Sequence, residues 1–209
     1  MNILDFLDKK TLNLVNLSAS YLFKSNFEFM FLAYKWHSLE NLKKYGHITL
    51  WDTTNITNMN NAFRDMTNFN ELLLWNTQNV TIMTSIFKGA KKFNKPLNFI
   101  TTKVFTFSEM FCDAESFNQP INFDVTSLTD TFAMFLNAKS FNQPINFDTS
   151  NLDDISYMFY GASSFDQNIE NWDVSNCNEI DDDIFEKSKL KKNKKIPLWF
   201  YKNRIKRYF

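Results

Sequence analysis

Two histidines, His37 and His47, are the side chains best suited to act as an imidazole base or a metal ligand. Neither belongs to a catalytic or metal-binding motif, and three scattered glycines cannot build a phosphate-binding loop. Aspartates are more numerous, but one group of them recurs at nearly constant spacing: Asp52, Asp124, Asp148 and Asp173. A catalytic acid pair occurs once in a chain, so these aspartates indicate a repeated turn. The sequence predicts no enzyme, no metal site and no cofactor.

The elements that carry these residues repeat along the chain. Aromatic residues recur every 24 to 26 positions in three columns, which are Trp51, Trp75, Phe99, Phe123, Phe147 and Trp172, then Phe63, Phe87, Phe111, Phe135, Phe159 and Phe185, then Phe69, Phe93, Phe117, Phe141 and Phe165. A fixed period of this length is typical of repeat proteins. One unit buries too little apolar surface to offset the entropy of ordering it, so the units are expected to stack.

Within one unit the apolar spacing changes. Residues 144–148 alternate between apolar and polar, which predicts a short strand. Apolar residues from 152 to 165 fall at steps of three and four, which predicts a short helix or a run of helical turns. A Ser or Thr, such as Ser150, precedes the helical part and is expected to cap it. The predicted fold class is an α/β repeat: a leucine-rich-repeat-like solenoid of about six 24-residue coils, with a short parallel strand and a short helix in each.

A polar column follows the third aromatic column and contains Asn70, Asn94, Asn118 and Asn142, with Asp166 after them. We expect a structural ladder in which each side chain bonds the backbone of the adjacent coil. The alternative is a row of ordinary polar turn residues.

The repeat carries a recognisable motif, seen best in Met134-Phe135, Ala138 and the run from Phe141 to Ile145. It resembles the BspA-type leucine-rich-repeat surface protein family over about two-thirds of the chain. The resemblance implies a solenoid that binds partners without enzymatic activity, and members of that family are often adhesins or surface lipoproteins. The start of this chain shows no secretion signal, lipobox cysteine or membrane span, so we expect an intracellular protein, or a viral one that acts in a host cell.

Residues 1–47 do not keep the period and are predicted to form a helical N-terminal cap, ahead of repeats in 48–190. The run from Ile3 to Leu12 is also similar to a degenerate F-box. That similarity implies docking of residues 1–46 to the Skp-type adaptor of a cullin ubiquitin ligase.

The C-terminal end, residues 191–209, is predicted to be a basic and aromatic cap. From Lys187 onward the chain holds 10 basic and no acidic side chains, whereas residues 48–186 hold 7 basic and 19 acidic ones. Basic residues mixed with aromatics also suit nucleic acid. We favour the cap, because the neighbouring coils already supply an acidic partner.

Three residues differ in type from the residues at the same position of the other units, without an evident packing reason. Ile100 and Phe105 take positions that are polar in the other units, and so does Ile82 one unit earlier. Such breaks indicate function, and we predict that Ile82, Ile100 and Phe105 form a small apolar patch for a protein partner. The leading hypothesis is a non-enzymatic protein-protein interaction module. A ubiquitin-ligase substrate adaptor and a cell-surface or virion adhesin are the alternatives, and drift of a degraded repeat would also explain the patch.

Overall fold

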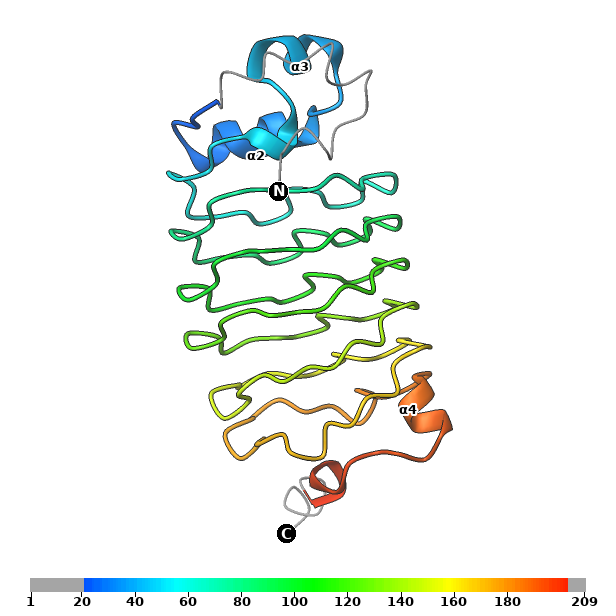
Figure 1. Ribbon diagram of the computed structural model, residues 1–209. Helices are drawn as coiled ribbons and strands as arrows, with labels where there is room; N and C mark the ends of the chain where they lie inside the picture. The colour runs from blue at the N-terminus through cyan, green and yellow to red at the C-terminus, as the bar shows by residue number, and fades with distance from the viewer. Residues whose placement is uncertain (1–20, 203–209) are drawn as a thin grey trace.

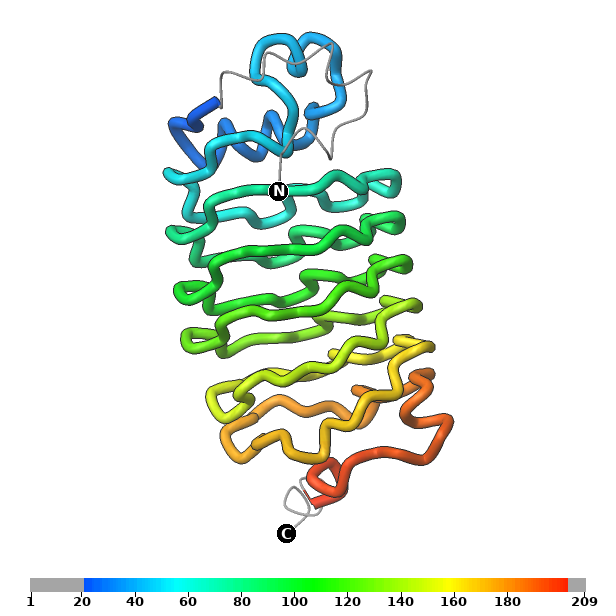
Figure 2. The backbone as a smooth tube through the Cα atoms, in the orientation of Figure 1, coloured from blue at the N-terminus to red at the C-terminus, as the bar shows by residue number. Residues whose placement is uncertain are grey.

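The computed structural model describes residues 21–202, and Figures 1 and 2 show a stack of coils with short helices at its two ends. The helices are α2 (Asn26–Tyr34), α3 (Leu39–Tyr45), the 3-10 helix η2 (Ile48–Leu50) and α4 (Lys189–Lys192). Residues 198–202 are helical as well. Within residues 21–202, no helix has the length and apolar character needed to cross a membrane.

The aromatic columns form continuous rows inside the stack. The ring centroids of Phe87 and Phe111 lie 5.7 Å apart, those of Phe111 and Phe135 5.6 Å, and those of Phe135 and Phe159 5.9 Å, with nearly parallel planes. Phe117 stacks on Phe111 within one coil at 3.8 Å. Side chains 24 positions apart therefore lie directly over one another, and this part of the prediction is confirmed.

The predicted helix in each coil is wrong. In its place lies a turn segment in which the N–H groups alternate between two kinds of partner. In the first coil the N–H groups of Met59, Asn61 and Phe63 donate to carbonyls of the next coil at 2.9–3.0 Å, whereas those of Ala62 and Arg64 donate to carbonyls three residues earlier. An α-helix directs these N–H groups to its own carbonyls and leaves none for a neighbour.

Each of the first five turn segments also has two residues with left-handed backbone angles, and the last segment has one; such angles interrupt a helix. In the first coil they are Asn61 and Asp65, both with φ of 59°. The same two positions recur in later coils at Ser85, Gly89, Glu109, Asp113, Ala133, Asn137, Tyr157, Gly161 and Lys187. The steps of three and four in the apolar pattern therefore reflect successive turns with one buried face.

The predicted parallel strand is also wrong, because the extended segments of the coils carry no strand within residues 21–202. Proline at 96, 120 and 144 has no N–H group to donate, so a regular backbone ladder cannot form there. Hydroxyl groups of buried threonines form hydrogen bonds between coils instead. The hydroxyl of Thr77 donates to the backbone carbonyl of Ile100 at 2.9 Å, and that of Thr101 donates to the backbone carbonyl of Asp124 at 2.8 Å. The fold class, a strand-plus-helix leucine-rich-repeat-like solenoid, is thus corrected to a stack of turn-built coils.

Within residues 21–202, parallel pairing between coils takes the form of isolated single-residue bridges only. These join one row of positions from coil to coil, namely Asn58, Ile82, Thr106, Asp130, Asp154 and Glu179.

The recurring aspartates have the structural turn role predicted for them. Asp124 accepts hydrogen bonds from the N–H and the hydroxyl of Thr126, and Asp148 does the same for Ser150. These bonds from Thr126 and Ser150 lower the pKa of the two carboxyls. The hydroxyl column therefore bonds to aspartate two residues earlier and does not cap a helix.

Both ends of the stack are covered. At the N-terminal end Phe29 of α2 makes an edge contact with Trp75 at 5.3 Å, and Trp36 contacts Phe69. At the C-terminal end Trp199 stacks on Trp172 at 6.3 Å, while the neighbouring Leu198 is 62% exposed.

Candidate functional site

Two of the predicted partner-binding residues flank one tight turn. The turn spans residues 101–104 and is closed by a hydrogen bond from the N–H of Val104 to the carbonyl of Thr101 at 2.9 Å. Ile100 before it is 47% exposed and Phe105 after it is 44% exposed. Both large apolar side chains therefore face solvent at the same edge of the stack.

Phe105 makes the same backbone hydrogen bonds as the polar residues that occupy its position in other coils. Its N–H donates to the carbonyl of Thr81 at 3.1 Å, and its carbonyl accepts from the N–H of Thr129 at 3.0 Å. The same bond joins Thr81 to Thr57. Since threonine fills this position in three other coils, the fold does not require a phenylalanine here.

Ile82 lies in the adjacent row of bridged residues, between Asn58 and Thr106. It is half-buried, so it presents less surface than Ile100 or Phe105. Ile82 can therefore line the base of an apolar patch, but it adds little to the exposed part of that patch.

Leu74 is an exposed apolar residue that the sequence analysis missed. It is 40% exposed and lies on the outward side of the extended segment, two residues before Asn76, the residue aligned with Ile100. The signal was present, because the equivalent positions in the next three coils are asparagine, at 98, 122 and 146. We define the patch as Leu74, Ile82, Ile100 and Phe105.

The asparagine column forms inter-coil hydrogen bonds. The side-chain carbonyl of Asn70 accepts from the N–H of Asn94 at 2.9 Å, and the same bond recurs from Asn118 to Asn94, from Asn142 to Asn118 and from Asp166 to Asn142. The asparagine side chains therefore already have hydrogen-bond partners within the protein. Asp166 ends the row and accepts a bond from Lys195 of the tail at 2.9 Å.

Acidic residues follow the patch along the bridged row in the later coils. Asp130, Asp154 and Glu179 occupy successive coils, and Asp130 accepts a hydrogen bond from Thr106 at 2.8 Å. Burial raises the pKa of Asp154, and the charges of Asp130 and Glu179 raise it further, against the opposing bond from Ser156. No cluster of three or more His, Cys, Asp or Glu side chains that could hold a metal occurs within residues 21–202.

The two cysteines are unsuited to nucleophilic chemistry. Both are free thiols, Cys112 buried and Cys177 partly buried. Burial raises the pKa of each to about 12, so neither forms an appreciable thiolate at neutral pH.

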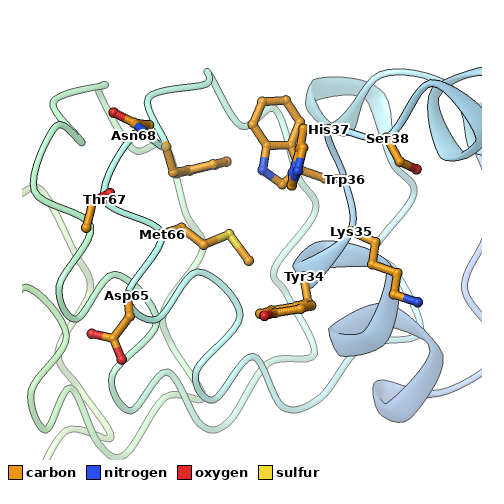
Figure 3. Close-up of a pocket in the computed structure, with 10 residues that line it drawn as sticks. Tyr34, Lys35, Trp36, His37, Ser38, Asp65, Met66, Thr67 and Asn68 are labelled. Atoms are coloured by element: carbon orange, nitrogen blue, oxygen red, sulfur yellow. The ribbon is translucent and has the colours of Figure 1, made fainter.

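A groove of about 680 Å³ lies between α2 and the first coil (Figure 3). Figure 3 shows the rings of Tyr34 and Trp36 on one side of the groove and the Met66 side chain on the other, while Lys35 and Asp65 point away. The groove is therefore mainly apolar. No motif in the sequence predicted it, because it joins the N-terminal region to a coil.

The F-box-like run from Ile3 to Leu12 lies outside the described residues. No curated protein and no solved structure gives a match to this chain. One protein family matches it twice, over residues 25–146 and 98–199. The matches agree with the BspA-type resemblance of the repeat and give no support to an F-box. Since they span residues 25–199, the chain belongs to the family described as Mycoplasma protein of unknown function, DUF285.

Proposed function

We propose that this protein is a non-enzymatic protein-recognition module, with the patch of Leu74, Ile82, Ile100 and Phe105 as its contact surface. The observation that carries the proposal is the 44% exposure of Phe105 in a column that is otherwise polar. A large exposed apolar side chain is costly in water and is favoured where a partner covers it.

The backbone around the patch supports a recognition role over a packing role. Ile100 donates its N–H to the hydroxyl of Thr77 at 2.7 Å, and its carbonyl accepts from the same hydroxyl. Those bonds do not involve the isoleucine side chain. The repeat thus supplies a rigid frame, and its outward side chains are available for recognition.

The test restores the residues that the repeat uses elsewhere. A double variant, Ile100→Asp with Phe105→Thr, introduces the side chains found at these columns in other coils, so the free energy of unfolding should change by no more than about 0.5 kcal/mol. Loss of two central apolar contacts should weaken partner binding by roughly 30-fold or more.

The measurement is quantitative affinity purification of the full chain from its native cells. Partners are compared between the wild type, the double variant and a control, Leu198→Asn, which removes an exposed apolar side chain from the C-terminal end. Partners lost in the double variant alone support the proposal. An unchanged set of partners with unchanged folding contradicts it.

A further inference from the structure

Two aromatic side chains in the turn segments, Phe132 and Tyr157, occupy positions that are polar or small in the other coils. The residues aligned with Phe132 are Asn60, Thr84, Ser108, Ser156 and Asp181, and those aligned with Tyr157 are Asn61, Ser85, Glu109 and Ala133. Both aromatic side chains are half-buried, and their ring centroids lie 5.9 Å apart with planes at 72°. The apolar core is formed without either ring. The repeat therefore does not require an aromatic residue at either position.

A carboxylate is held beside each of these two residues. Asp130 accepts a hydrogen bond from the N–H of Phe132 at 2.9 Å, and Asp181 accepts one from the N–H of Tyr157. Asp154 is bridged to Asp130 in the row that joins adjacent coils. Burial raises the pKa of both Asp154 and Asp181, because neither carboxylate is fully solvated. Three carboxylates therefore border the two rings.

These carboxylates differ from acidic side chains elsewhere in their lack of a basic partner. Within residues 21–202, Asp130, Asp154 and Asp181 form no ion pair. Several other acidic side chains of the coils are paired with lysine, namely Glu109 with Lys88, Glu115 with Lys91 and Lys139, and Asp166 with Lys195. A partly buried carboxylate without a cation is costly, and an approaching cation offsets that cost. The surface around the two rings is therefore complementary to positive charge.

The chain's own Lys187 shows how a cation is accommodated at the edge of this surface. Its ammonium group lies 5.0 Å from the ring centroid of Tyr160, and that ring lies 6.2 Å from the ring of Tyr157. The negative face of an aromatic ring attracts a cation at this distance. In the part of the chain that the structure describes, no lysine or arginine lies in this way over the ring of Phe132 or of Tyr157. These two rings can therefore receive a cation from another molecule.

We propose that an arginine-containing basic segment of a protein partner binds at this place. The binding surface, which we name the aromatic-acidic surface, consists of Phe132, Tyr157, Asp130, Asp154 and Asp181. Arginine fits it better than lysine, because a planar guanidinium stacks on an aromatic face while its N–H groups bond a carboxylate. The inference does not rest on the patch around Phe105, since the two surfaces share no residue.

The test compares two short fluorescent peptides that differ only in charge. One contains arginines separated by Gly-Ser, and the other has citrulline, the neutral analogue of arginine, at the same places. Binding to the full-length chain is measured by fluorescence anisotropy at physiological salt, where long-range attraction is screened. The arginine peptide should bind at least about tenfold more tightly than the citrulline peptide. Equal binding of the two peptides, or no measurable binding of the arginine peptide, would overturn the proposal.

A first variant removes the rings and keeps the net charge. Phe132→Ser combined with Tyr157→Asn introduces the residue types found at these positions in Ser156 and Asn61, so thermal unfolding should change little. The arginine peptide should bind about tenfold more weakly, because two cation–ring contacts are lost. Unchanged affinity in this folded variant would show that the rings take no part and would also overturn the proposal.

A second variant removes charge and keeps the backbone hydrogen bonds. Asp130→Asn combined with Asp181→Asn retains an oxygen that can accept from the backbone, as Asn58 accepts from the N–H of Asn60 at 2.8 Å. Affinity for the arginine peptide should fall by about tenfold or more. The matched control, Asp124→Asn combined with Asp148→Asn, removes two charges outside this surface and should change affinity by less than about threefold. Equal losses in the variant and the control would reduce the effect to net charge and would contradict the proposed site.

Discussion

The two sides of each coil are held together by different bonds. On the turn side, backbone N–H groups of alternate residues reach the next coil, and the rings of Phe111 and Phe135 stack at 5.6 Å. On the extended side, threonine hydroxyls bond the next coil, and the rings of Trp75 and Phe99 lie 6.5 Å apart. The turn side depends on main-chain geometry, whereas the extended side depends on particular side chains.

This difference explains where the repeat tolerates unusual residues. Leu74 and Ile100, two of the exposed apolar residues, lie on the outward face of the extended side. Their side chains take no part in the bonds that join the coils. The extended side can therefore vary its surface while the turn side preserves the period.

The largest expected effect comes from the aromatic row of the turn side. Phe111→Ala should lower the free energy of unfolding by about 3–5 kcal/mol, as for other buried phenylalanines. Phe123→Ala, on the extended side, should cost about 1–2 kcal/mol less, because Phe111 loses stacked contacts with three rings and stacking adds about 0.5–1.5 kcal/mol per pair. Chemical denaturation of both variants measures the difference, and equal losses would remove the distinction between the two sides.

The next effect tests the left-handed positions of the turn side. Gly161 has φ of +69°, and a Cβ atom there would lie 2.1 Å from the side-chain oxygen of Asn137. Gly161→Ala should cost about 2–3 kcal/mol, through backbone strain and loss of the bond from Asn137 to Asp113. The control on the extended side is Asn98→Ala, an exposed position where thermal unfolding should be almost unchanged.

A smaller effect is expected from the side-chain bonds of the extended side. Thr77 is fully buried and both donates to and accepts from the backbone of Ile100. Thr77→Val should lower the free energy of unfolding by about 1–2 kcal/mol, because it leaves these two backbone groups without their partner. Thr77→Ser keeps the hydroxyl and should retain most of the stability in urea unfolding. If valine were as stable as threonine, the extended side would not depend on this hydroxyl.

The smallest effect concerns charge on the bridged row. Burial raises the pKa of Asp154 above its ordinary value of 3.8, so its charged form is less favourable in the folded chain. That destabilisation is fully present above the raised pKa and disappears as the pH falls below the ordinary value. Asp154→Asn should therefore gain stability at pH 7, by at most about 0.5 kcal/mol after screening by solvent. Unfolding measured at pH 7 and at pH 3 gives the sign, and a loss at pH 7 would contradict this account.

The stacked rows were predictable from the sequence, but the path of the backbone was not. Phe111, Phe135 and Phe159 recur at a fixed interval, and this alone indicates that they lie over one another. The turn segment was mistaken for a helix because buried residues at steps of three and four suit both. Ala133, Glu109 and Tyr157 have left-handed backbone angles, but their residue types do not indicate it. The hydrogen bonds between coils offset the free-energy cost of these angles, and such bonds exist only in the assembled stack.

The candidate site was predictable where a residue departs from its column. Ile100 and Phe105 stand out in this way, and Leu74 would have done so by the same comparison. The groove beside Tyr34 and Trp36 could not be found like this, since the N-terminal region has no repeat against which a departure can be seen. Its position depends on how α2 lies across the first coil.

The last position of the asparagine row bears on how the coils are joined to the C-terminal tail. Asp166 replaces asparagine there, and its carboxylate bonds Lys195 and Asn193 of the tail. At this position one carboxylate oxygen therefore bonds the tail, whereas the preceding coils bond one another through neutral side-chain amides. The acid in place of the amide thus attaches the closing segment to the coils by an ion pair with Lys195, an attachment that high salt concentrations would weaken.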